Sequence, residues 1–244
     1  MNQENIVITA GYDKSQFVLD VVNRLLHNGI QVNSVIVTKT INLKRINKVL
    51  YTQGFSGLLN AFIKSKGQSN DANKNKISLK QWCRVNRVKY LSVKDINSIK
   101  VENHLKGLHN TLLIYGGGGI IRQNIIDACN MGILNAHLGL LPQIRGMNAA
   151  EWNVLLNLPQ AVSIHFIDSG IDTGNVLEKV YYDVGTIKSR EELRIRALEE
   201  GAKAITEVVR NFDYRKVGDQ NFVVYRQCYK ISAYMESILL NKLN

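Results

Sequence analysis

The sequence predicts an α/β fold: a doubly wound, mostly parallel sheet with helices on both faces. Two observations predict it. The chain opens with an apolar run from Asn5 to Ala10, a helical pattern, and a second apolar run from Gln31 to Lys39. A strand–helix–strand start of this size favours a parallel pair with a right-handed crossover. Further short apolar runs at Tyr90 to Val93 and Thr111 to Tyr115 extend the alternation of strands and helices.

The first helix is predicted from Asp13 to Asn28, because its apolar residues share one stripe and Gly29 follows it. A capping-box spacing, Ser189 with Glu192, starts a long helix that is predicted to end at Phe212. The other predicted elements are helix Ile120 to Met131, strand Ile133 to His137, helix Asn148 to Leu156, strand Val176 to Val184, strand Asn221 to Tyr225 and helix Ile231 to Leu243.

The chain is divided here into a main domain, residues 1–212, and a C-terminal appendage, residues 213–244. Within the main domain, residues 40–89 form an irregular insertion, because their apolar pattern is broken by Gly54, Gly57 and a polar stretch from Ser65 to Asn75. An insertion of this kind is a natural place for substrate recognition, and it fits a helical hairpin without chemical consequence equally well.

Composition indicates a soluble protein with a real core, since 45% of its 244 residues are hydrophobic. Met1 to Ala10 has no basic start of a signal peptide, and no apolar run approaches the roughly 20 residues that span a bilayer. We therefore expect a cytoplasmic protein without membrane contact. Cys83, Cys129 and Cys228 are odd in number and widely spaced, which predicts reduced thiols and no metal site.

The net charge of +11 is concentrated between Lys64 and Lys89. Such a basic segment would bind phosphates with a salt-dependent affinity. A solvated loop is the favoured interpretation, since Trp82 and Tyr90 are too few for a base-stacking platform. Nucleic acid is accordingly a disfavoured but open partner, and an acidic small molecule also suits a basic surface.

Asn135, His137 and Asp172 carry the chemistry expected of this chain. Residues i and i+2 of a strand point to one face, so Asn135 and His137 project together. An amide donates a hydrogen bond without titrating, and a nearby carboxylate favours the protonated imidazole. With no Ser or Cys beside the histidine, the nucleophile must come from a substrate. We expect Asn135 and protonated His137 to stabilise an oxyanion, while Asp172 orients the histidine and helps to remove a proton from an attacking amine.

The ordered segments around these residues resemble the 10-formyltetrahydrofolate-dependent formyltransferases, which include methionyl-tRNA, glycinamide ribonucleotide and sugar N-formyltransferases. The resemblance rests on Asn135-Ala136-His137, Leu140 to Gly146, Ser163 to Asp168 and Ile171 to Gly174. It covers Leu112 to Tyr182 well and the first strand and helix in outline. It implies catalytic residues Asn135, His137 and Asp172, a formyltransferase domain over residues 1–212, and 10-formyltetrahydrofolate as co-substrate, with no metal.

The resemblance also implies where folate binds. Gly116 to Gly119 follow a strand, and this loop corresponds to the family segment that holds the pterin. This chain departs from the family by having glycines where a bulkier or basic residue is often found. The residues carried over as folate-binding are Gly118, Gly119, Ile120, Ile121, Phe166, Ile167, Asp168 and Gly170. His165 is expected to be a packed, hydrogen-bonded histidine outside the catalytic set.

The acceptor is expected to be a small-molecule primary amine on a nucleotide-linked sugar, destined for a glycan. Gly11, Tyr12, Arg145 and Gly146 are the candidate substrate-binding residues, although Arg145 fits a surface ion pair equally well. The short tail leaves no room for the C-terminal barrel of methionyl-tRNA formyltransferases, and the loop at Gly11 lacks the glycines of the glycinamide ribonucleotide enzymes. The alternatives are a truncated methionyl-tRNA formyltransferase, a formyl-folate hydrolase and a non-catalytic folate or nucleotide binder. The hydrophobic C-terminal segment is also compatible with a homodimer.

Overall fold

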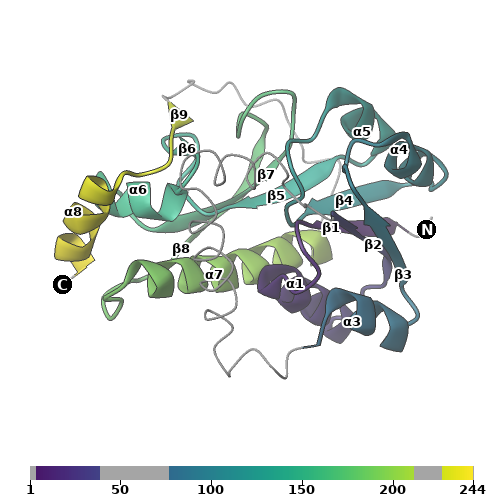
Figure 1. Cartoon of the computed structure of the whole chain (residues 1–244), viewed down its shortest axis with the longest axis horizontal. Helices are drawn as coiled ribbons and strands as arrows, with labels where there is room; N and C mark the ends of the chain where they lie inside the picture. The colour runs from purple at the N-terminus through teal and green to yellow at the C-terminus, as the bar shows by residue number, and fades with distance from the viewer. Residues whose placement is uncertain (1–3, 39–76, 212–226, 244) are drawn as a thin grey trace, which may run out of the picture.

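The computed structural model describes residues 4–38, 77–211 and 227–243. A seven-stranded sheet lies at the centre of the fold that these residues form (Figure 1). The strands of the large sheet are β1 (Asn5–Ala10), β2 (Val32–Thr38), β3 (Lys89–Val93), β4 (Thr111–Tyr115), β5 (Ile133–His137), β7 (Ala161–Phe166) and β8 (Val176–Tyr181). The helices are α1 (Gln16–His27), α3 (Leu79–Val85), α4 (Ile99–Lys106), α5 (Gln123–Ala128), α6 (Ala149–Leu155), α7 (Arg190–Arg210) and α8 (Ala233–Leu243). Two short strands, β6 (Arg145–Gly146) and β9 (Gln227–Cys228), pair separately.

The strand order β3-β2-β1-β4-β5-β7-β8 confirms the predicted doubly wound, mostly parallel sheet. The first five strands in this order pair in parallel, and β7 and β8 are antiparallel to their neighbours. Asn135 lies directly opposite His165 where β5 meets β7. The reversal thus brings the end of β5 beside polar residues of a strand that follows much later in the chain.

The alternation of side chains along β1 divides the core between the two faces. Ile6 and Ile8 pack with α1, α3 and α7, whereas Val7 packs with α4 and α5 on the other face. Figure 1 shows α1, α3 and α7 together along one side of the sheet. A Cβ atom at Gly201 of α7 would lie 3.5 Å from the Cβ of Ala136. This glycine lets α7 pack close beneath the strand that carries Asn135 and His137.

Several predicted boundaries need correction. The predicted irregular segment is wrong at its end, because α3 occupies Leu79–Val85, with the Ser78 hydroxyl accepting from the Gln81 N–H. The predicted helix from Ile120 to Met131 is only Gln123–Ala128, since Arg122 before it is extended and Cys129 after it has non-helical dihedrals, φ −106° and ψ 85°. The predicted strand at Asn221 to Tyr225, the part of the irregular insertion up to residue 76, and the first half of the basic segment, residues 64–76, lie outside the described residues.

Residues 227–243 pack on the same end of the molecule as α6. There β9 pairs with β6, and the Trp152 indole N–H donates to the Tyr229 carbonyl at 2.7 Å. The Asn148 side-chain oxygen accepts from the Ile231 N–H at 3.2 Å. The predicted C-terminal segment is therefore attached at several points to the chain that follows β5.

Candidate active site

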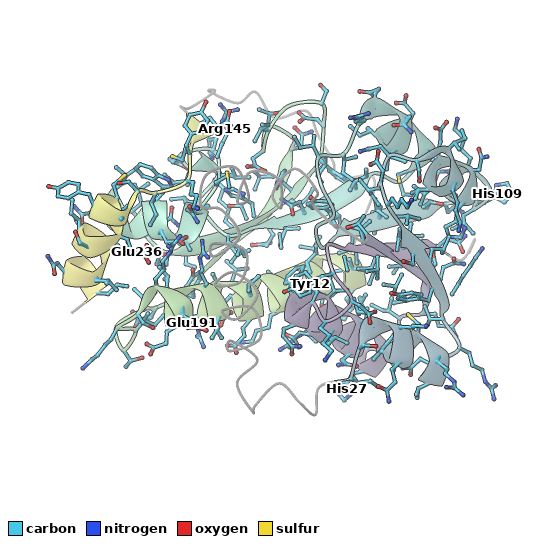
Figure 2. All side chains as sticks on the ribbon, in the orientation of Figure 1. Tyr12, His27, His109, Arg145, Glu191 and Glu236 are labelled. Carbon is cyan, nitrogen blue, oxygen red and sulfur yellow. The ribbon has the colours of Figure 1, made fainter. Side chains whose placement is uncertain are left out.

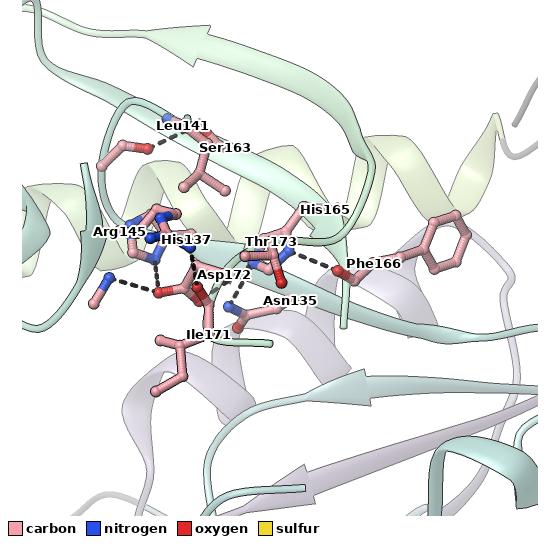
Figure 3. Close-up of polar contacts among 12 residues, drawn as sticks. Asn135, His137, Leu141, Arg145, Ser163, His165, Phe166, Ile171, Asp172 and Thr173 are labelled. Carbon is pink, nitrogen blue, oxygen red and sulfur yellow. Dashed lines mark hydrogen bonds and ion pairs between the residues drawn. The ribbon is translucent and has the colours of Figure 1, made fainter. Parts of the chain in front are cut away.

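The structure brings Asn135, His137 and Asp172 together, as predicted (Figure 3). Asn135 and His137 project from the carboxyl end of β5, and Asp172 lies in the loop between β7 and β8. The His137 Nδ1 atom is 3.4 Å from Asp172 Oδ2. Asp172 has a positive φ of 53°, a conformation that Asp and Asn tolerate better than most residues. The three side chains form a compact polar cluster at the edge where such sheets bind ligands.

His165 belongs to this cluster, which the sequence alone did not reveal. It is buried, as expected of a packed histidine, with 1% of its surface exposed. Its Nδ1 atom lies 2.7 Å from the Phe166 carbonyl oxygen and must donate to it, so Nε2 is left as an acceptor. The Asn135 amide nitrogen lies 3.0 Å from this Nε2 atom. His165 therefore fixes the orientation of the Asn135 amide and leaves its second N–H for a substrate oxygen.

The protonation expected for His137 needs correction. Its Nε2 lies 2.8 Å from the Ile144 carbonyl oxygen and donates to it. Burial lowers the pKa of His137, and the opposing effects of the Asp172 charge and the Ile144 carbonyl are smaller. The resting imidazole is thus neutral near pH 7, and its Nδ1 atom is a proton acceptor. An imidazolium formed there would be stabilised by the carboxylate of Asp172.

The segment between β5 and β6 holds His137 in place. Ser163, opposite His137, donates its hydroxyl to the Gly139 carbonyl at 2.8 Å and accepts from the Leu141 N–H at 3.0 Å. These bonds position the loop that presents the Ile144 carbonyl. At its end, the Gly146 N–H donates to Asp172 Oδ2 at 2.7 Å. The loop therefore contacts both the histidine and the carboxylate.

Gly146 is also the point where the loop meets the C-terminal segment. Its φ is +95°, and a Cβ atom there would meet the Cys228 carbonyl oxygen. We expect Gly146→Ala to lower the free energy of unfolding by about 2–4 kcal/mol, through backbone strain and steric conflict together. Activity should fall as well. Gly29→Ala is the matched control, because its φ is also positive, +74°, but nothing lies within 4 Å of the added atom. Urea unfolding of both variants tests this, and equal losses would contradict the assigned contact.

The buried histidines predict that acid destabilises the protein. Burial, followed by the charge of His137, lowers the pKa of His165 to about 4 from 6.5. Between these values the unfolded chain binds a proton that the folded chain does not, so stability falls as the pH drops from 6.5 to 4, by up to about 3 kcal/mol for this residue. In urea unfolding measured across this pH range, the free energy of unfolding should fall less in His165→Gln than in the wild type. Parallel pH profiles for the two proteins would exclude this role for His165.

The predicted folate-binding residues fall into two groups. Gly118 and Gly119 have φ values of +126° and +115°, which favour glycine, and no atom lies within 4 Å of a Cβ built at Gly119. Ile120 beside them is 79% exposed. This open backbone with an adjacent apolar side chain fits a flat aromatic ligand. Ile121, by contrast, is a core residue that packs with the α4 and α5 cluster.

The opposite predicted wall is formed by Phe166 to Gly170. The Phe166 ring packs against the core and close to Gly132, so its backbone rather than its ring faces the polar cluster. Ile167 is half-buried and its N–H donates to the Ile133 carbonyl at 2.8 Å. Asp168 Oδ1 accepts from the Gly170 N–H at 3.0 Å and from the Thr173 hydroxyl at 2.6 Å. Asp168 thus shapes the turn that delivers Asp172.

The four candidate substrate-binding residues are not all in one place. Gly146 and Arg145 adjoin the polar cluster, since the Gly146 N–H donates to Asp172 and Arg145 Nη1 lies 3.4 Å from the Ile171 carbonyl oxygen. Gly11 lies against the glycine loop, where its Cβ position is 3.4 Å from the Gly118 nitrogen. Tyr12 is exposed. Gly11 therefore borders the predicted folate loop, and neither Gly11 nor Tyr12 lines the pocket that adjoins His137.

A pocket of about 360 Å³ opens beside the candidate catalytic residues. Its lining includes Asn135, His137 and Gly146, and residues of α6 and α7 also contribute to it. Within the described part of the chain, no group of three or more His, Cys, Asp or Glu side chains is placed to hold a metal ion. No helix among those residues is long and apolar enough to cross a bilayer.

Comparisons with a family model and with related proteins agree on one family. A family model described as formyl transferase matches residues 6–209. A methionyl-tRNA formyltransferase from Solibacter usitatus is 34% identical over 99 residues, which cover 40% of this chain and 32% of that protein. The chain thus matches about a third of the length of that relative.

Solved structures share the fold. A sugar N-formyltransferase from a Shewanella species superposes with a TM-score of 0.63 at 12% identity, covering 99% of this chain and 88% of that one. A sugar 3-N-formyltransferase, determined in the presence of dTDP and 5-N-formyltetrahydrofolate, gives a TM-score of 0.58 at 17% identity over 100% of this chain and 78% of that one. At these identities the likeness concerns the fold.

Proposed function

Since this chain belongs to the formyl transferase family, we propose that it moves a formyl group from 10-formyltetrahydrofolate to a primary amine on a nucleotide-linked amino sugar. The observation that carries this proposal is the pocket beside Asn135 and His137, whose volume of about 360 Å³ suits a small molecule. The fold shared with sugar N-formyltransferases adds support. We also propose that the protein acts in the cytoplasm.

In the proposed reaction 10-formyltetrahydrofolate supplies the activated formyl group, and Gly118, Gly119, Ile120 and the Ile167 to Gly170 turn hold it. As the amine nitrogen bonds to the formyl carbon, the carbonyl electron pair moves to oxygen. The free N–H of Asn135 then donates to this oxygen. Neutral His137 accepts the amine proton on Nδ1, and the adjacent Asp172 carboxylate stabilises the resulting imidazolium. The oxyanion electron pair then re-forms the carbonyl, the bond from the formyl carbon to N10 of the folate breaks, and this nitrogen takes the proton from His137, which returns to its neutral form.

Methionyl-tRNA is the second candidate acceptor, because the Solibacter relative that shares 34% identity is named as a methionyl-tRNA formyltransferase. The net charge of +11 would suit a polyanion. Formylation of a tRNA would depend steeply on salt concentration, whereas formylation of a nucleotide-linked sugar would depend on it weakly. This difference separates the two candidates in one titration.

A panel of acceptors tests the proposal directly. The purified protein and 10-formyltetrahydrofolate are incubated with several nucleotide-linked amino sugars, with initiator methionyl-tRNA or with no acceptor, and the products are read by mass spectrometry. The mass gain of one formyl group on a sugar is the expected result. Formylated tRNA alone would replace the proposed acceptor with the second candidate. Formate release without an acceptor would indicate a hydrolase, and no reaction at all would contradict formyl transfer.

A further inference from the structure

The pocket beside Asn135 and His137 has both apolar and polar lining residues. The apolar ones are Ala136, Leu138, Ala149, Ala150 and Leu198. The polar ones include Asn135 and His137 of β5, Glu151 of α6 and Arg194 of α7. A ligand whose amine lies at His137 would therefore share the pocket with a guanidinium group.

Glu151 is a buried carboxylate, with 2% of its side chain exposed. Its Oε1 atom accepts from Arg194 Nε at 2.7 Å, from Arg190 Nε at 2.8 Å and from the Asn148 amide at 3.2 Å. Removing a carboxylate from water is costly unless it is paired in good geometry. The buried Glu151 carboxylate therefore fixes the orientation of both arginine side chains.

The two arginines differ in how many of their N–H donors are already paired with a carboxylate. Arg190 is 19% exposed and makes a second bond, from Nη1 to Glu236 of α8 at 2.9 Å. Figure 2 shows Glu236 at the end of the molecule where α8 lies. Arg194 is 46% exposed, and within the described residues Glu151 is its only partner, through Nε. The N–H groups on both its Nη atoms therefore stay available at the pocket.

We infer that Arg194 determines acceptor specificity by binding an anionic group of the acceptor, a phosphate or diphosphate, and that Glu151 positions it. A guanidinium offers paired donors that match phosphate oxygens, and a fixed Nε leaves fewer torsions to order on binding. The inference rests on the proposed function, because the amine end of the same ligand lies at Asn135 and His137. The apolar residues of the same pocket lining contact the sugar that joins the amine to the anionic group.

The test compares Arg194→Gln with Arg196→Gln. Arg196 is the matched control because it lies on the same helix, is 44% exposed and pairs with Glu200 at 3.1 Å, away from the pocket lining. With the acceptor that the panel identifies, Arg194→Gln should raise its KM about 10-fold or more, since charge-assisted hydrogen bonds are lost. The turnover number and the KM for 10-formyltetrahydrofolate should change little. Arg196→Gln should leave all three constants unchanged.

Binding of inorganic pyrophosphate, measured by calorimetry, provides a readout that needs no acceptor. The wild type and Arg196→Gln should bind it equally, and Arg194→Gln at least about 10-fold more weakly. Because loss of Arg194 alters the pairing of buried Glu151, Arg194→Lys serves as a second variant that keeps the charge. It should bind pyrophosphate more weakly than wild type because the paired donors are gone.

The outcomes separate this inference from the proposed function. If a sugar is formylated with the same KM by wild type and Arg194→Gln, the role of Arg194 is wrong and the function stands. If no sugar is formylated but pyrophosphate binding depends on Arg194, the anion site stands and the acceptor is wrong. Equal pyrophosphate binding by all four proteins would overturn the inference.

Discussion

His137→Asn should lower turnover by roughly 100-fold or more while folate binding stays nearly unchanged. The expected loss follows from the position of the imidazole, which lines the pocket and whose Nδ1 atom lies 3.4 Å from Asp172 Oδ2. An amide cannot accept the amine proton, so this step would fall to water. The measurement is steady-state turnover with the verified acceptor, together with calorimetric titration of formyl-folate.

The buried position of His137 calls for a second variant. Asparagine leaves the Ile144 carbonyl without its donor, which alone would cost stability. His137→Gln places an amide near the former Nε2 position and keeps that donor, yet it also lacks a titratable group. Both variants should therefore be inactive to a similar degree. His27→Asn is the control, because His27 lies at the exposed end of α1. This variant should keep the turnover of the wild type. Near-normal turnover in His137→Gln would exclude proton transfer to this residue.

Asp172→Asn is expected to cost turnover as severely, by about 100-fold or more. Asparagine tolerates the positive φ of this position, so the loop should keep its shape. Its side-chain oxygen would continue to accept from the Gly146 N–H. The imidazolium of His137 would nevertheless lose the negative charge that stabilises it, and the barrier to proton transfer would rise.

Asp172→Asn should also disturb Asn135, because the second carboxylate oxygen of Asp172 lies near His165. Asp172 Oδ1 lies 3.7 Å from His165 Nε2, the atom that accepts from Asn135. An amide nitrogen in its place would compete for that lone pair and release the Asn135 side chain. Turnover of Asp172→Asn is compared with Asp127→Asn, an exposed position on α5. A variant with a wild-type melting temperature and undiminished turnover would contradict the role of the carboxylate.

The joint projection of Asn135 and His137 was predictable because it is local: both share one face of β5 by the two-residue period of a strand. Asp172 lies in the later loop after β7, and it was assigned to the same cluster through the resemblance to the formyltransferase family rather than through a local pattern. His165 was placed correctly in the interior, but its bond to Asn135 depends on the register between β5 and β7. Register between strands 30 residues apart leaves no mark in a single sequence.

Other features escaped sequence reasoning for similar reasons. Helix α3 is only seven residues long, too short for a clear periodic pattern, although Ser78 before it was a readable capping signal. Ile120 and Ile121 are adjacent isoleucines, so the sequence does not distinguish them. Only the packing of α5 places Ile121 in the core and leaves Ile120 exposed. The contact between Arg194 and Glu151 joins residues 43 positions apart. Long-range ion pairs of this kind become visible only once the helices are placed.

The pairing of β6 with β9 has a consequence for the order in which the protein is made. A ribosome synthesises Asn135, His137 and Asp172 well before Gln227 and Cys228, and among the described residues no strand of the later segment pairs with the large sheet. The loop that presents the Ile144 carbonyl and the Gly146 N–H, however, gains its neighbouring strand only after Gln227 and Cys228 have been synthesised. A nascent chain that has not yet reached these two residues would thus hold Asn135, His137 and Asp172 without their final alignment.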